Sequence, residues 1–125
     1  IVTVTAAREP LFSAGLVRAG THISAMGADG EGKQELDPAL FAKANLFADV
    51  VEQSITVGEY EKAFKTGLID KEHITPFGEV LNGRAGRTNN QQITVFDSSG
   101  MALQDIAICA LALENARNMG MAKEI

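Results

Sequence analysis

The sequence predicts an α/β protein built on a mainly parallel, twisted sheet with a long helix at its C-terminal end. Short β-rich runs alternate with segments of helical spacing along the chain, and this order favours parallel strands joined by crossover connections. The first run, residues 1–5, is β-branched and apolar on both faces, which is typical of a strand covered on both sides. The longest helical segment, residues 101–119, follows the last such run.

In the first half of the chain we expect two strands and a helix. Residues 1–5 should form an interior strand, and residues 21–26 a second strand that ends in the glycine-rich loop 27–32. Asp37 and Pro38 then provide an N-cap and a first-turn proline, so a short helix is predicted to follow them.

The middle of the chain repeats this order of strand and helix. Residues 46–51 predict a strand and residues 59–69 a helix. The Thr-Pro pair at 75–76 is expected to begin another short helix, with Val80 and Leu81 turned inward.

The last part of the chain predicts a polar loop at 84–92, a strand at 93–96 and the long helix. Cys109 lies in the inner stretch of this helix and is expected to be a small core residue. Gly120 follows the helix, where a C-cap glycine belongs. One face of the helix is predicted to carry Leu103, Ile106, Ala110, Leu113 and Arg117.

Composition and charge exclude several classes of partner. The 125 residues suffice for one domain or part of one. A net charge of −5 without a dense run of Lys and Arg offers no patch for nucleic acid or anionic lipid, and no apolar stretch is long enough for a membrane span. Cys109 is the single cysteine, and no Cys/His cluster has the spacing of a zinc site. We therefore expect a cytoplasmic protein without a metal site.

Three polar loops follow predicted strands, and ligands of parallel sheets bind beyond the carboxyl ends of the strands. The loops are residues 5–7, 27–33 and 97–100. Loop 27–33 lets the backbone approach a ligand closely and offers a carboxylate and an ammonium group, although a solvated turn has the same composition. Loop 97–100 offers hydroxyl and amide groups at the start of a helix, where the serines could equally well cap that helix.

Three stretches together resemble the ornithine cyclodeaminase/mu-crystallin family. They are THISAMGAD at residues 21–29, GKQELD at 32–37 and FDSSGMALQD at 96–105. Residues 4–11 and 77–83 are similar to family segments as well, so the resemblance covers nearly the whole chain. Ser24 and Glu31 depart from the residues that are common in the family, which affects the loop geometry rather than the resemblance.

The resemblance implies that residues 1–125 form the second half of a Rossmann-type, NAD(P)-binding domain. The half with the glycine-rich turn is expected to lie before Ile1, together with a separate N-terminal domain that holds the substrate and forms a dimer. NAD is the implied cofactor, with NADP as the alternative. On its own the 125-residue chain is expected to be inactive, to bind NAD weakly or not at all, and to self-associate through the open strand at 1–5.

By position, the resemblance implies roles for individual residues. Asp29 is similar to the catalytic acid/base aspartate of the family, beside the substrate amine. Lys33 and Ser98 match positions that contact the dinucleotide, and Thr5 and Ala6 match the strand end on the nicotinamide side. The chemistry agrees with the place of Asp29, because removal of a hydride from the α-carbon of an amino acid requires an unprotonated amine, and a carboxylate can accept that proton.

The function that the resemblance implies is that of an NAD-dependent, amino-acid-deaminating enzyme of the ornithine cyclodeaminase type. Hydride leaves ornithine, the side-chain amine attacks the resulting imine, ammonia departs, and the hydride returns to give proline. Alanine dehydrogenase, cyclic ketimine reductase and a non-catalytic small-molecule-binding fragment are the alternatives. An amino-acid or imino-acid substrate and a homo-oligomer are implied for the enzymes.

Overall fold

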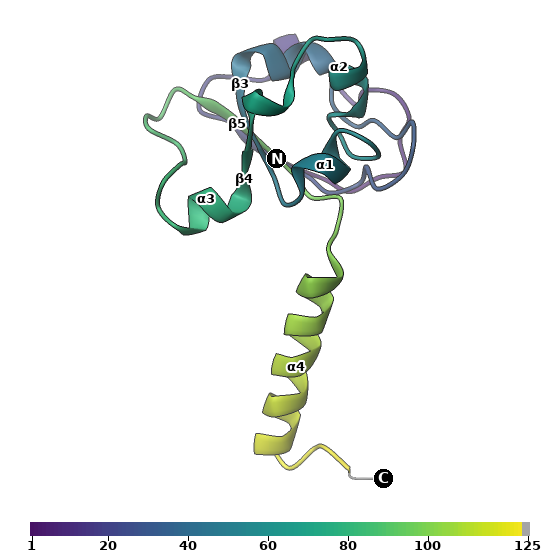
Figure 1. Ribbon diagram of the computed structural model, residues 1–125, viewed down its shortest axis with the longest axis vertical. Helices are drawn as coiled ribbons and strands as arrows, with labels where there is room; N and C mark the ends of the chain where they lie inside the picture. Colours follow the sequence, from purple (N-terminus) through teal and green to yellow (C-terminus); the bar gives the residue numbers. More distant parts are fainter. Residues whose placement is uncertain (124–125) are drawn as a thin grey trace.

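The structure, a computed structural model, describes residues 1–123 and contains the predicted parallel α/β sheet. Within these residues five strands pair in the order β1-β2-β5-β3-β4, and every neighbouring pair is parallel (Figure 1). The predicted fold class is therefore confirmed. The strands are β1 (Val2–Thr3), β2 (His22–Ala25), β3 (Ala44–Ala48), β4 (Ile74–Pro76) and β5 (Ile93–Asp97).

Helices and short 3-10 segments fill the connections between the strands. The segment predicted after Asp37 is a 3-10 helix, and the Asp37 carboxylate accepts hydrogen bonds from the amides of Ala39 (3.0 Å) and Ala14 (2.9 Å). The α-helices are α1 (Val51–Ser54), α2 (Glu61–Lys65), α3 (Phe77–Leu81) and α4 (Ala102–Asn118), and the 3-10 helices are η1 (Ala14–Leu16), η2 (Pro38–Lys43) and η3 (Lys71–His73).

The order of the strands decides which face of the sheet each connection covers. From β1 through β2 and β3 to β4 the chain advances toward one edge of the sheet, and it turns back from β4 to β5. Because crossovers between parallel strands are right-handed, the connection that turns back covers the opposite face. Figure 1 accordingly shows α3 on the other side of the strands from α1 and α2.

The core lies on the face that α1, α2 and η2 cover. Ile23, Leu46 and Val95 point to this face from neighbouring strands and are 0–2% exposed. Tyr60 packs edge-on against Phe41. The buried hydroxyl of Tyr60 donates to carbonyl oxygens of β3 and β5, at 3.0 Å each, so the aromatic layer is fixed to the sheet by hydrogen bonds as well as by packing.

The segment around β4 differs from the prediction. Thr75 and Pro76 end a strand rather than begin a helix, because Thr75 pairs with Phe47 and a proline is tolerated on an edge strand. α3 follows directly, but Leu81 is 75% exposed and Val80 is only partly buried. The predicted inward packing is therefore wrong for Leu81, whereas Val80 faces the sheet beside Phe77 and Phe96. β3 also begins and ends earlier in the chain than predicted.

β1 is an edge strand among the described residues, as expected for residues 1–125 without the preceding half of the domain. Among the described residues β1 pairs with β2 alone, with Val2 opposite Ser24 and Thr3 opposite Ala25. Val2 is 68% exposed, whereas Thr3 is buried. The interior position predicted for this strand in the complete domain stays a prediction.

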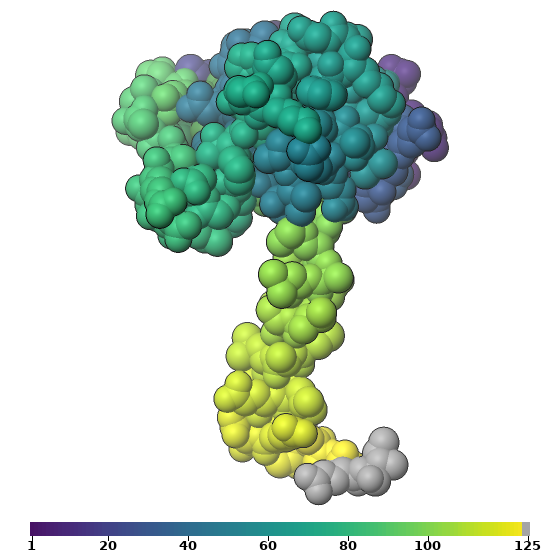
Figure 2. Space-filling model, viewed as in Figure 1, coloured from purple at the N-terminus to yellow at the C-terminus, as the bar shows by residue number. Residues whose placement is uncertain are grey.

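α4 extends away from the body of the molecule beyond the carboxyl end of β5 (Figures 1 and 2). The described part of the chain buries none of its residues, and Leu103, Ile106 and Leu113 are 49–67% exposed. The predicted packing face is therefore wrong within this chain, and Cys109 is exposed rather than part of the core. Residues 1–123 contain no helix with both the length and the apolar character that a membrane crossing requires.

A series of buried carboxylates connects the carboxyl ends of the strands to the loops that follow them. Asp97, at the end of β5, accepts hydrogen bonds on Oδ2 from the Ser54 hydroxyl and from the amide of Glu59 (3.0 Å). The Glu59 carboxylate in turn accepts hydrogen bonds from the amides of Glu35 (3.1 Å) and Leu36 (2.6 Å). The loops around residues 35 and 59 are thereby anchored to β5.

Burial controls the protonation of these groups. Glu59 and Asp97 are fully buried, and within residues 1–123 neither forms an ion pair with a Lys or Arg. Burial raises the pKa of Glu59 to about 7 and the pKa of Asp97 to about 7. The packing around Asp97 is tight, because a Cβ at Gly58 would overlap Asp97 Oδ2 and the Cα atom of Ser54.

We predict that the free energy of unfolding falls as the pH rises from about 4.5 to about 7. A carboxyl group whose pKa is raised by folding contributes most to stability below its unfolded pKa, and this contribution is lost as the pH rises through the folded pKa. Asp29, Asp37 and Glu61 have lowered pKa values and act in the opposite direction below this range. His22, whose pKa is lowered by burial, opposes the fall within the range, but it is one group against two. Urea unfolding at a series of pH values measures the slope.

Glu59→Gln removes one of the titrating groups and should flatten this slope. Glu52→Gln, which changes an exposed carboxylate on α1, is the matched control and should leave the slope unchanged. A wild-type free energy of unfolding that is constant or rises between pH 4.5 and about 7 would contradict the raised pKa values.

The open edge of β1 predicts self-association of the 125-residue chain. Ile1, Val2 and Val4 are 57–68% exposed on a strand edge, an arrangement that invites pairing with a further strand. Val2→Lys should lower the apparent mass in light scattering towards that of a monomer, because a lysine on an edge strand blocks pairing. Ile106→Lys tests α4 in the same way, and dissociation by this variant alone would assign the contact to the helix instead.

Candidate functional site at the carboxyl edge of the sheet

The predicted polar loops meet at one edge of the sheet. The register places Thr3 opposite Ala25, and Asp97 opposite both Ala25 and Ala48, so β1, β2, β5 and β3 end side by side. The three loops predicted from the sequence start from these strand ends, and their placement is confirmed. Asp49, which sequence reasoning did not identify, follows the end of β3 at the same edge.

The carboxylate of Glu35 joins the ends of β1 and β2. Its Oε1 atom accepts hydrogen bonds from the amide (2.6 Å) and the hydroxyl (2.8 Å) of Thr5. Its Oε2 atom accepts them from the hydroxyl of Thr3 (2.7 Å) and the amide of Gly27 (3.0 Å). A Cβ at Gly27 would overlap the Thr5 carbonyl oxygen and Glu35 Oε1. Only glycine therefore lets the backbone at position 27 lie this close to Thr5 and Glu35. Sequence reasoning missed Glu35 because a glutamate in a loop is normally exposed.

Asp29 and Lys33 form an ion pair on the loop after β2. The side chains are 61% and 26% exposed, respectively, so the pair is open to solvent. The hydrogen bond from Lys33 is the main cause of a lowered pKa at Asp29. Asp29 is therefore a carboxylate at neutral pH. The far end of the loop is held by Gly32, whose amide donates to Glu61 Oε2 (2.9 Å).

Ser98 is anchored by Asp49. The Ser98 hydroxyl donates to Asp49 Oδ2 (2.8 Å), and the amide of Gly100 donates to the same atom (3.2 Å). The Ser98 amide donates to the carbonyl oxygen of Ala25 (3.0 Å), which joins this loop to the end of β2. An aspartate directly after a buried strand is the signal by which Asp49 could have been found.

The structure thus brings some of the predicted residues into contact and separates others. Asp29 contacts Lys33, whereas Ser98 is held by Asp49 and Thr5 by Glu35. Both Thr5 and Ala6 are exposed at the strand end.

Unsatisfied polar atoms remain beside Ser98. The N-cap of α4 is Met101, which makes no side-chain capping bond, so the alternative in which the serines cap the helix is wrong. Ser99 Oγ and Asp97 Oδ1 are buried and lack a hydrogen-bond partner among the described residues. Hydroxyl and ammonium donors at this edge fit a dinucleotide, whose ribose and phosphate oxygens accept hydrogen bonds. His, Cys, Asp and Glu side chains within residues 1–123 form no group that could hold a metal ion.

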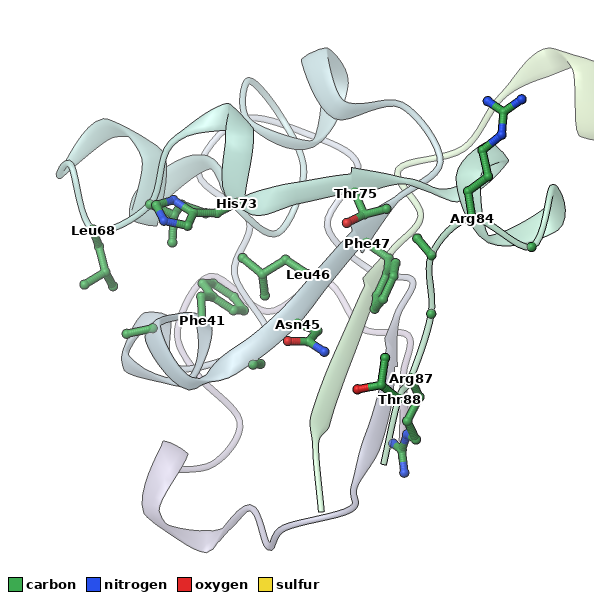
Figure 3. A pocket seen from close by; sticks show the side chains of 16 residues that line it. Phe41, Asn45, Leu46, Phe47, Leu68, His73, Thr75, Arg84, Arg87 and Thr88 are labelled. Carbon is green, nitrogen blue, oxygen red and sulfur yellow. The ribbon is translucent and has the colours of Figure 1, made fainter. Parts of the chain in front are cut away.

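Hollows elsewhere on the sheet do not include the predicted residues. A hollow of about 700 Å³ lies along β3 and β4, and Asn45, His73, Arg84 and Thr88 are among the residues that line it (Figure 3). Another, of about 510 Å³, lies on the sheet face under α3, next to Phe77. Neither is lined by a residue that the sequence assigns to the site.

The fold and this edge define a class of protein. A parallel α/β sheet that gathers polar loops, hydroxyl donors and an ion pair beyond the carboxyl ends of its strands has the arrangement of Rossmann-type dinucleotide-binding domains. Within that class, the model of the ornithine cyclodeaminase/mu-crystallin family matches residues 1–120. The chain belongs to this family, and the resemblance inferred from the sequence is confirmed.

Solved structures and curated relatives support this assignment. The iminosuccinate reductase of Paracoccus denitrificans, in complex with NAD⁺, matches with a TM-score of 0.94 at 42% identity over 100% of this chain and 39% of that chain. An archaeal alanine dehydrogenase dimer with bound NAD matches with a TM-score of 0.91 at 42% identity over 99% of this chain and 39% of that chain. The ornithine cyclodeaminase of Brucella abortus is 31% identical over 100% of this chain and 34% of its own length. The chain therefore spans 34–39% of the length of these relatives.

We predict that Lys33→Met raises the pKa of Asp29 towards its ordinary value, because the hydrogen bond and the charge of Lys33 are what lower it. NMR titration of the aspartate carboxyl carbons in the 125-residue chain measures this shift. Lys71→Met, which removes an exposed ammonium group paired with Glu52, should leave Asp29 unchanged. An Asp29 pKa that is the same with and without Lys33 would show that the ion pair does not form in solution.

Proposed function

We propose that the protein that carries this sequence is an NAD-dependent oxidoreductase that interconverts an amino acid and an imino acid. The carboxylate of Asp29 carries this proposal, because it lies exposed on the loop after β2 at the carboxyl edge, where an ionised carboxyl group can accept a proton from a substrate. Identities of 41% with an iminosuccinate reductase and 42% with an alanine dehydrogenase, each over the whole chain, support a reductase or dehydrogenase.

Asp29 is proposed to carry the proton of the reaction. When bound, NAD accepts or supplies the hydride. In the oxidative direction the Asp29 carboxylate takes a proton from the substrate ammonium group, and this frees the nitrogen lone pair to form the C=N bond as hydride leaves the α-carbon. In the reductive direction the same carboxyl group returns the proton to nitrogen. Lys33 pairs with this carboxyl group and favours its ionised form before the substrate arrives.

The other predicted residues are proposed to hold the dinucleotide, with NADP as the alternative to NAD. Thr5 and Ala6 are assigned to the nicotinamide side, because their strand end is joined to the Asp29 loop through Glu35. Lys33 can contribute its ammonium group to a phosphate oxygen. Ser98 is assigned to the same ligand, since it lies next to the unsatisfied hydroxyl of Ser99.

Cyclodeamination of ornithine is the second candidate function. Ornithine cyclodeaminases of Brucella are 31% identical over the whole chain, and the same first hydride step precedes ring closure in that reaction. An assay with ornithine separates the two candidates, because cyclodeamination yields proline and ammonia without net NADH, whereas a dehydrogenase accumulates NADH. Binding of an amino acid without turnover would instead indicate a non-catalytic role. A homo-oligomer is proposed because the matched alanine dehydrogenase is a dimer.

Asp29→Asn should lower turnover by about 10²–10⁴-fold, because the amide keeps the size of the side chain but accepts no proton. NADH formation with a panel of amino acids, and NADH consumption with the corresponding imino acids, measures the effect in the protein that carries this sequence. Asp70→Asn is the matched control, since Asp70 is also exposed and also pairs with a basic side chain, that of His73. Turnover of Asp29→Asn close to that of wild type would remove Asp29 from the mechanism.

A further inference from the structure

Glu35 is the side chain that connects the two halves of the proposed site. Thr5 directly precedes Ala6 on the strand end assigned to the nicotinamide side, and Gly27 lies two positions before Asp29. Glu35 accepts hydrogen bonds from Thr5 on one oxygen and from Gly27 on the other. The elements that must present the hydride acceptor and the proton acceptor to one substrate are therefore joined by a single carboxylate.

The partners of Glu35 fit the two oxygens of a carboxyl group and do not fit an amide. Each oxygen faces one hydroxyl donor and one backbone N–H, which belongs to Thr5 at Oε1 and to Gly27 at Oε2. Hydroxyl groups can rotate and accept a hydrogen bond, but a backbone N–H only donates. The NH₂ group of a glutamine would thus face the N–H of Thr5 or of Gly27 in either orientation, and one strand end would be released.

Glu35 is itself held firmly from the protein interior. Its side chain is fully buried, its amide donates to the Glu59 carboxylate (3.1 Å), and its carbonyl oxygen accepts from the amide of Leu11 (2.8 Å). The Glu59 amide is bound to Asp97 at the end of β5. A group that is supported in this way can hold its partners in one geometry, which is what productive alignment of reacting groups requires.

We infer that Glu35 is a positioning residue that fixes the Thr5 strand end relative to the Asp29 loop for hydride and proton transfer. The inference rests on the proposed function. Glu35→Gln lowers the rate of hydride transfer by about tenfold to a hundredfold, since a misplacement of about 1 Å can cost about 10²-fold. The KM for NAD changes less than kcat, and the primary deuterium isotope effect from an α-deuterated amino acid increases as hydride transfer becomes rate-limiting.

The experiment compares this variant with two others in the protein that carries this sequence. Glu52→Gln makes the same chemical change at an exposed site on α1 and leaves the kinetics unchanged. Thr3→Val removes one donor to Glu35 Oε2 while it keeps the shape of the side chain, so it gives a smaller loss in the same direction. If Glu35→Gln does not fold, the kinetics of Thr3→Val test the positioning role of Glu35 instead. Circular dichroism and urea unfolding give the folded fraction of each variant.

Each outcome decides for or against the inference. A folded Glu35→Gln variant with the kcat and isotope effect of wild type overturns it. A loss of rate that disappears after correction for the folded fraction, with an unchanged isotope effect, assigns Glu35 a purely stabilising role and also overturns it. If the wild-type protein transfers no hydride with any amino or imino acid, the proposed function is wrong. Amide hydrogen exchange then decides, because faster exchange at Thr5 and Gly27 in Glu35→Gln supports the positioning role of Glu35, and unchanged exchange overturns it.

Discussion

The carboxyl edge of this sheet depends on buried carboxylates that backbone amides and hydroxyl groups stabilise. Asp97, Glu59 and Glu35 form a series in which the amide of Glu59 donates to Asp97 and the amide of Glu35 donates to Glu59. A buried charge without hydrogen bonds is strongly unfavourable. The loops that contain residues 34–36 and 58–59 must therefore bring their donors to the same place, and their conformations follow from that requirement.

Local patterns in the sequence predict the fold class and the location of the site. Alternating β-rich and helical runs indicate a parallel sheet, and the polar loops 5–7, 27–33 and 97–100 are found at one edge, as predicted. These patterns reflect the burial of consecutive residues with the period of a strand or a helix, so they can be read without a structure. The family resemblance is confirmed, whereas the roles of Asp29 and Ser98 stay predictions.

Contacts between distant parts of the chain could not be predicted in the same way. Glu35 and Glu59 resemble ordinary surface residues in the sequence, and only the folded chain shows that they are buried against each other. β4 is short and ends in a proline, which conceals its pairing with β3. The apolar residues of β1 and α4 indicate a tendency to be covered, but their spacing does not specify the covering element.

The close packing at Gly27 and Gly58 limits the set of sequences that can adopt this architecture. Neither position has a positive φ among the described residues, so lack of space, rather than backbone conformation, excludes a side chain there. Even a methyl group would displace the buried oxygens of Glu35 or Asp97. These two positions therefore have almost no freedom to accept another residue while the edge stays folded. The requirement for glycine at positions 27 and 58 thus comes from the packing of this edge and does not depend on the substrate.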